Sequence, residues 1–253
     1  MTLKPIALLL SLLLITNAAL GDDEDLPPAT KKASIYTQLA AEYFRRGQLN
    51  FALEDIQKAL DADPKYATAH SVAGLIFNQM QEDDTAQKQF AEALRLSPDD
   101  PDINHNFGWF LCQHGKLADG VARYVAAAKN PLYRTPEKSL ISAGECIAKT
   151  GDLDAARNFY LQALQARVSS AIARQQLVEI DLRRDDYAEA KRYLIELQKL
   201  VQPSATLAWL SLRVERALQN KDAEAHYEDV LRKAYPDSPE TTLLLNKKYD
   251  AAQ

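Results

Sequence analysis

Apolar and small residues recur along the chain at helical spacing, in short runs that polar turns interrupt. The first run places Tyr36, Leu39 and Tyr43 on one helix face, and the next run places Ile56 and Ala59 on one stripe. Turns such as RRGQLN, HGKL and TGDL separate consecutive runs. Apolar positions three and four residues apart are the pattern of amphipathic helices, so the chain predicts a series of antiparallel helical hairpins.

The same residue types return at a fixed interval. One set recurs 34 residues later: Ala52, Ala59, Leu60 and Pro64 return as Ala86, Ala93, Leu94 and Pro98. The interval stretches to 36 residues where Gly108 returns as Gly144, and it is 34 again from Ala156 to Ala190. A single hairpin cannot bury its apolar face, whereas stacked hairpins bury one another, so the period predicts a repeat array.

This pattern resembles the tetratricopeptide repeat, a hairpin unit of 34 residues. The sequence therefore predicts an all-α fold, a tetratricopeptide-repeat solenoid of about six helix-turn-helix repeats over residues 33–238. The units are placed at 33–66, 67–100, 101–136, 137–170, 171–204 and 205–238. Residues 239–253 are predicted to form a C-terminal capping helix and tail, because a terminal repeat needs a polar outer face. Gly47, Gly115 and Gly151 are expected to take the positive φ that ends a helix.

The first 32 residues differ from the repeats. Residues 1–21 combine Lys4, the apolar run IALLLSLLLI and the ending TNAALG, which are the parts of a secretory signal peptide. An uncleaved anchor is the alternative. Residues 22–32, DDEDLPPATKK, are predicted to be a disordered acidic linker. Export to an oxidising compartment is expected.

Composition and charge argue against one class of partner, nucleic acid. The chain is 47% hydrophobic and 26% charged, as soluble folded proteins are, and its formal net charge is −5. Nucleic-acid binding needs a basic stripe, so no nucleic-acid partner is expected.

The segment INHNFGWFLCQHG, residues 103–115, concentrates reactive side chains. A thiol nucleophile needs a histidine within hydrogen-bond reach, yet Cys112 and His105 lie seven residues apart, or about 10.5 Å along a helix. A metal site needs further converging ligands, and His70 and His226 are scattered. We therefore expect no enzymatic activity, no cofactor, no metal and no small-molecule substrate.

Two cysteines in an exported chain favour a disulfide. Cys112 and Cys146 fall on the first helices of the third and fourth units, and a bond between them would clamp the irregular step of 36 residues. Two free buried thiols are the alternative.

The repeat register also predicts a protein-binding groove. In tetratricopeptide arrays, positions 5, 9 and 12 of the first helix line the concave face, and His105 and Trp109 fall there with Asn104 beside them. Groove-facing registers of other units hold Arg45, Asn78 and Glu145. The alternative for Trp109 is a core position, and the alternative for the three residues from other units is an ordinary solvated side chain.

The segments QLAAEYFRRGQLNFAL, INHNFGWFLCQHG and GECIAKTGDLDAA resemble the type IV pilus biogenesis/stability protein family PilW, also called PilF. The resemblance covers residues 33–238. It implies a periplasmic scaffold of six repeats at the outer membrane, which supports the secretin pore and stabilises pili. It also implies that Cys112 and Cys146 are bonded, and that type IV pilus components, including the secretin, are the partners.

One departure concerns lipidation. The lipoprotein form of that family requires a cysteine just after the signal peptide, and the equivalent stretch here, AALGDDED, has none. Membrane association is therefore expected only through partners. A generic cell-envelope interaction module, serving cell-wall or outer-membrane assembly, is the alternative function.

Overall fold

The computed structural model describes residues 27–249, and these form thirteen α-helices and no strand. The predicted all-α class is confirmed. The helices are α1 (Pro28–Arg45), α2 (Leu49–Ala62), α3 (Ala67–Gln79), α4 (Asp83–Leu96), α5 (Pro101–Gln113), α6 (Leu117–Lys129), α7 (Pro136–Ala148), α8 (Leu153–Ala166), α9 (Ala171–Arg183), α10 (Tyr187–Gln198), α11 (Ala205–Ala217), α12 (Lys221–Ala234) and α13 (Pro239–Leu245).

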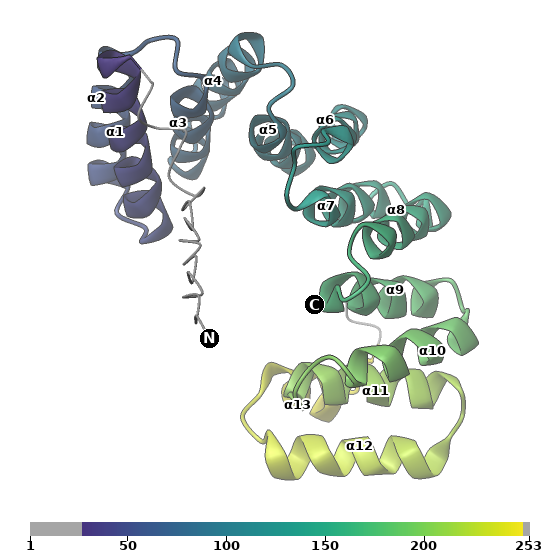
Figure 1. The fold of residues 1–253 in the computed structure, drawn as a ribbon. Helices are drawn as coiled ribbons and strands as arrows, with labels where there is room; N and C mark the ends of the chain where they lie inside the picture. The colour runs from purple at the N-terminus through teal and green to yellow at the C-terminus, as the bar shows by residue number, and fades with distance from the viewer. Residues whose placement is uncertain (1–26, 250–253) are drawn as a thin grey trace, which may run out of the picture.

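Consecutive helices pair as antiparallel hairpins, and the hairpins stack into an arc (Figure 1). The odd-numbered helices α3, α5, α7 and α9 lie along the inner side of the arc, and their even-numbered partners lie along the outer side. Each inner helix also packs against the inner helix of the next unit. The solenoid therefore has one continuous concave face, which the first helix of every unit builds.

One residue with positive φ ends the first helix of every unit. The predicted glycines are confirmed, because Gly47, Gly115 and Gly151 have φ of 70°, 75° and 87°. The other three units place non-glycine residues there, with φ between 58° and 64°: Gln81, Asp185 and Gln219. These six positions follow one another at the 34- and 36-residue intervals of the sequence, so backbone geometry reproduces the repeat register.

Small residues set the distance between the two helices of a hairpin. A Cβ added at Gly74 would lie 2.8 Å from the Phe90 ring on α4, and one at Gly144 would overlap the Tyr160 ring on α8. Both rings are almost fully buried. The glycines therefore let an aromatic side chain of the outer helix pack directly on the backbone of the inner helix.

The start of the array corrects one expectation. Residues 28–32, which the sequence predicted as part of a disordered linker, form the first turn of α1, where Pro28 takes the position that proline favours. The linker's ordered end also has a contact, because the Thr30 hydroxyl donates to Asp63 at 2.7 Å. The predicted signal peptide and the rest of the linker lie outside the described residues.

At the other end, α13 packs against α11 and α12. Ser238 caps its first turn by accepting a hydrogen bond from the Thr241 N–H at 3.1 Å. Leu244 joins the buried cluster around Trp209 and Leu231. The last hairpin is therefore covered by apolar contacts from beyond the sixth unit.

Candidate functional site

Polar side chains on the concave face are bonded to one another across neighbouring inner helices. The partners lie 31 to 36 residues apart, which is one repeat. The pairs are His105–Ser139, Asn106–Ser71, His114–Asn78, Gln176–Glu145 and Arg213–Glu179. Because each pair joins two units, this ladder fixes the spacing of the inner helices and presents a preorganised surface to a partner.

Asn104 does not belong to this surface, so its prediction as a groove residue is wrong. Its side chain is 1% exposed. The amide Nδ2 donates to the carbonyls of Pro98 and Asp100 at 2.8 and 2.9 Å, and Oδ1 accepts from Arg123 at 3.3 Å. With these groups engaged, Asn104 holds the connection between two units and has no accessible donor for a peptide.

His105 is partly buried at the junction of the third and fourth units. Its Nδ1 shares a hydrogen bond of 2.8 Å with Ser139 Oγ on α7, and its ring meets Tyr124 edge-on at 5.3 Å. Burial, and then the positive charge of Lys138, lower the pKa of His105 below its ordinary value. Burial and the charge of Lys138 thus both favour the neutral imidazole.

Trp109 lies between two apolar clusters and is half-buried. On one side it packs against the cluster of Phe90 and Phe110, and on the other against the cluster of Cys112 and Tyr124. Trp109 is therefore neither a pure groove residue nor a pure core residue. Trp109 contributes to the packing between units, and the remainder of its ring stays accessible.

Asn78 and Glu145 occupy the ladder with solvent-accessible side chains. Asn78 Oδ1 accepts from His114 Nε2 at 2.8 Å, and Glu145 accepts from Gln176 Nε2 at 3.2 Å. Although Glu145 is among the exposed residues, the surrounding protein removes enough water to raise the pKa of its carboxyl, and Lys149 counteracts this in part.

Arg45 stands apart from the ladder. Its side chain is 73% exposed and pairs with Glu42 of its own helix. The structure gives it no contact with the other predicted groove residues.

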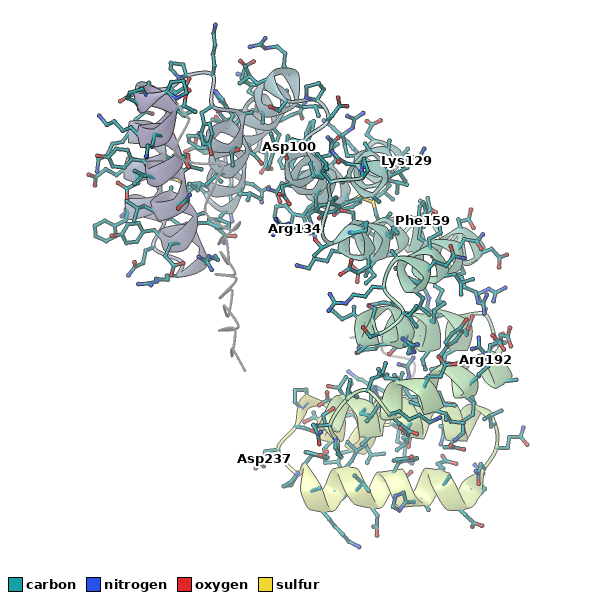
Figure 2. All side chains as sticks on the ribbon, in the orientation of Figure 1. Asp100, Lys129, Arg134, Phe159, Arg192 and Asp237 are labelled. Carbon is teal, nitrogen blue, oxygen red and sulfur yellow. A yellow bond between two sulfur atoms is a disulfide. The ribbon has the colours of Figure 1, made fainter. Side chains whose placement is uncertain are left out.

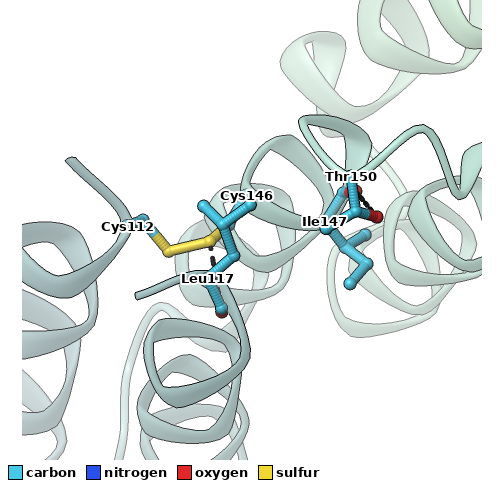
Figure 3. Close-up of a disulfide and its surroundings, with 5 residues drawn as sticks. All are labelled: Cys112, Leu117, Cys146, Ile147 and Thr150. Atoms are coloured by element: carbon cyan, nitrogen blue, oxygen red, sulfur yellow. Dashed lines mark hydrogen bonds between the residues drawn. A yellow bond between two sulfur atoms is a disulfide. The ribbon is translucent and has the colours of Figure 1, made fainter. Parts of the chain in front are cut away.

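The two cysteines form a disulfide (Figure 3). It joins Cys112 on α5 to Cys146 on α7, with the two Cα atoms 5.8 Å apart. Gly120 packs on Cys112, because a Cβ there would overlap the sulfur. The bond and the His105–Ser139 contact together link α5 and α7, the inner helices on either side of the 36-residue step.

Sequence reasoning missed His114, Ser139 and Gln176 as parts of the ladder. His114 shares a hydrogen bond with Asn78, and its ring lies against the Phe110 ring, with the centroids 4.3 Å apart and the planes inclined by 36°. One signal was available: polar residues spaced by one repeat on successive inner helices are in register to meet.

Among residues 27–249, no group of three or more His, Cys, Asp or Glu side chains is arranged to hold a metal ion. In the same range, every helix is too short or too polar to span a lipid bilayer.

Comparison with known proteins agrees with this fold. The sequence model of the tetratricopeptide repeat family matches residues 37–101. The type IV pilus assembly protein PilF of Pseudomonas aeruginosa is 23% identical over 207 residues, which are 81% of this chain and 81% of that protein.

Two solved structures superpose on most of the chain. The crystal structure of PilW, described as a widely conserved type IV pilus biogenesis factor, has a TM-score of 0.76 and 32% identity. The match covers 84% of this chain and 98% of that one. The Pseudomonas aeruginosa PilF structure has a TM-score of 0.74 and 20% identity, over 87% of this chain and 100% of its own. The second likeness shows the fold alone.

Proposed function

Because the chain belongs to the tetratricopeptide-repeat family of type IV pilus biogenesis proteins that includes PilW and PilF, we propose that it is a non-enzymatic adaptor of type IV pilus assembly. It binds a segment of a pilus component on its concave face. The observation that carries this proposal is the likeness to PilW, at 32% identity across 98% of that chain.

The geometry supports binding by the concave face. The hydrogen-bonded ladder holds the inner helices in place, so a partner pays little entropy to order the surface. Trp109 supplies a large ring that is partly accessible, and a half-buried aromatic side chain is the kind of anchor that dominates protein interfaces. Asn78 and Glu145, on the inner helices α3 and α7 that flank α5, offer polar atoms to a peptide backbone.

The disulfide supports a non-enzymatic role. Thiol catalysis needs a free thiolate, and the sulfurs of the two cysteines, Cys112 and Cys146, are bonded to each other. A disulfide also persists in oxidising compartments, which agrees with a periplasmic location. We place the adaptor at the outer membrane through its partners, with the secretin as the component whose assembly or localisation it supports.

A genetic complementation experiment tests this function. A strain lacking the gene is expected to lose pili and twitching motility, and the wild-type gene is expected to restore both. Glu145→Lys reverses a charge on the concave face without touching the core, and it is expected to restore them poorly. Asp119→Lys is the matched control, because it makes the same reversal at an exposed position of the outer helix α6.

Trp109→Ala provides a second variant. Since Trp109 also packs between units, circular dichroism of this variant must first show that the array is folded. A deletion strain that keeps its pili and twitching motility would contradict the pilus function and favour a general envelope role. If Glu145→Lys and Trp109→Ala both restored pili and twitching motility fully, this part of the concave face would not belong to the binding site.

A further inference from the structure

The connections between successive units lie along one edge of the array, because each of them joins the end of an outer helix to the start of the next inner helix. We call three successive connections with their flanking residues, 129–138, 167–174 and 199–204, the connection edge. Figure 2 shows Arg134 of this edge on the same side of the view as Asp237 of the last connection, and Arg192 on the opposite side. The connection edge is formed by helix ends, whereas the concave face is formed by helix sides.

Large apolar side chains protrude from all three connections. Leu132 is 85% exposed, Val168 is 73% exposed and Leu200 is 45% exposed. Leu132 lies in the connection that carries the two extra residues of the 36-residue step. Single exposed apolar residues are common on protein surfaces, but a set that recurs in successive connections points to an interaction surface.

Hydrogen bonds fix the backbone at two of these positions. Asn130 Nδ2 donates to the Asp99 carbonyl at 2.7 Å, and Asn130 Oδ1 accepts from the Leu132 N–H at 2.8 Å. Arg174 donates through Nη1 to the Val168 carbonyl at 2.5 Å. The two connections are therefore held in place while the apolar side chains that they carry remain in solvent.

The apolar surface continues inward beside the third connection. Val201, which follows Leu200, lines a hollow of about 240 Å³ between the start of α9, the end of α10 and the start of α11. Ile172 and Leu207 also line it, and Ile172 is itself exposed in the first turn of α9. The connection edge thus combines protruding apolar side chains with an apolar hollow.

The charged residues of the connection edge are mostly basic. Six basic residues lie on it: Lys129, Arg134, Lys138, Arg167, Arg174 and Lys199. Glu137 is the acidic residue of these three stretches, and its buried carboxylate accepts from Arg167 at 3.0 Å. Arg174 pairs with Glu196 of α10. Within residues 27–249, the other four basic residues form no ion pair.

Acidic residues bound this basic stretch at both ends. The preceding connection carries Asp99 and Asp100, with Asp102 in the first turn of α5, and the last connection carries Asp237. Asp102 lies close enough to Lys138 to interact with its charge, and so offsets part of it. The positive charge is therefore confined to the connection edge, in a chain whose formal net charge is −5.

A phospholipid surface fits this combination. Each protruding apolar residue has a basic residue one or two positions away, in the pairs Leu132–Arg134, Val168–Arg167 and Leu200–Lys199. At a bilayer surface, apolar side chains insert singly between acyl chains, while lysine and arginine keep their charges at the level of the phosphates. A protein interface instead has a continuous apolar core, whereas these three side chains are separated from one another by one unit each.

We propose that the connection edge binds the surface of an anionic phospholipid bilayer. The three protruding apolar side chains enter the acyl region, and Lys129, Arg134 and Lys199 contact the lipid phosphates. Because helix ends meet the bilayer, the sides of the inner helices stay open to a protein partner. The chain then has a membrane contact of its own beside the contact through partners, and this contact does not depend on the pilus function.

The test uses the exported chain purified from the cell envelope, with its first residue defined by mass spectrometry, so that wild type and variants share one N-terminus. Binding is measured by cosedimentation with vesicles of phosphatidylethanolamine and phosphatidylglycerol. The neutral control replaces phosphatidylglycerol with phosphatidylcholine. We expect binding to the anionic vesicles that weakens as salt screens the charges, and much weaker binding to the neutral vesicles.

Two variants, each with a matched control, localise the contact. Leu132→Ser is expected to weaken binding to anionic vesicles about tenfold, as for the loss of one inserted leucine side chain. Its control is Leu218→Ser, which changes an exposed leucine at the opposite edge. Lys199→Gln is expected to weaken binding about fivefold, as for one basic residue near an anionic surface. Its control is Lys88→Gln on the outer helix α4, and both controls are expected to bind as the wild type does.

A fluorescent label reports directly on insertion. Because Cys112 and Cys146 are bonded to each other, a maleimide dye reacts with a single introduced thiol, in Leu132→Cys or in the control Leu218→Cys. We expect the emission of a polarity-sensitive dye at position 132 to shift to shorter wavelength when anionic vesicles are added. The dye at position 218 is expected to keep the emission that it has in water.

Equal binding to anionic and neutral vesicles would overturn the proposal, because the charge of the lipid would then play no part. Unchanged binding of a Leu132→Ser variant that circular dichroism shows to be folded would also overturn it. So would a dye at position 132 that stays in water. If that position also captured a protein from the envelope through a photoreactive amino acid, the connection edge would be a protein-binding surface instead.

Discussion

Reduction of the Cys112–Cys146 disulfide is expected to destabilise the centre of the array. The bond closes a loop with a sequence separation of 34 residues, and the chain-entropy relation for a loop of this size gives about 4 kcal/mol at room temperature. In this relation the crosslink acts by restricting the unfolded chain, so the loss of that restriction is the expected main effect of reduction.

The loss should be local because repeat arrays are stabilised by each unit and its neighbours. The bond joins α5 to α7, and α7 otherwise packs chiefly against α6 and α8. Loss of the bond should therefore loosen the contact between α5 and α7 first, while α6 still holds α7 in the array. Trp109 reports on this region because it packs against the cluster that contains both cysteines.

Urea unfolding with and without a reductant measures both effects. Circular dichroism follows the whole array, and Trp109 fluorescence follows the centre in a Trp209→Phe background. We expect the reduced protein to lose about 4 kcal/mol, with the fluorescence transition at a lower urea concentration than in the oxidised protein. The double variant Cys112→Ala, Cys146→Ala controls for the reductant, which should not affect it. A difference below about 1 kcal/mol would refute the crosslink as a clamp.

Three further changes test the packing and the buried charges. Gly144→Ala places a methyl group against the Tyr160 ring and is expected to cost about 2 kcal/mol in thermal unfolding, whereas an unchanged melting temperature would show that the hairpin tolerates a wider spacing. The largely buried Arg157 donates to the Asp181 carboxylate at 2.6 Å, and Asp181→Ala removes this main partner. We expect the free energy of unfolding in urea to fall by about 3 kcal/mol. A fall of less than about 1 kcal/mol would contradict a structural ion pair. Burial lowers the pKa of His105, so its imidazole binds a proton less tightly in the folded chain than in the unfolded chain. The free energy of unfolding should therefore fall as the pH drops below 6.5, the ordinary pKa of histidine. His105→Gln should show a smaller fall between about pH 7 and about pH 5, and an identical pH dependence would refute the assignment.

The repeat register could be predicted from the sequence because small residues and turn residues are required locally. Gly74 and Gly144 touch aromatic rings of the paired helix, and Gly47, Gly115 and Gly151 take a backbone conformation that glycine favours. Both requirements are met within one hairpin. The residue types therefore marked the units and the irregular 36-residue step without knowledge of the fold.

The details of the concave face could not be predicted in the same way. Asn104 carries the right residue type and a register beside the groove, yet its amide is bonded to two carbonyls of the connection before α5. That arrangement depends on how the chain crosses between units. His114 and Asn78 lie 36 residues apart where the step between their units is 34 residues, from Gln81 to Gly115, so the two side chains do not occupy equivalent repeat positions and the repeat pattern alone does not pair them.

Crosslinking in the cell envelope tests most directly whether the concave face binds a pilus component. A photoreactive amino acid replaces Glu145 on the inner helix α7 or, as the control, Asp119 on the outer helix α6. Irradiation of piliated cells followed by mass spectrometry of the adducts is expected to join a type IV pilus component to the probe at position 145 and not to the probe at position 119. If the same proteins are captured at both positions, or if no pilus component is captured at position 145, the concave face is not the binding surface.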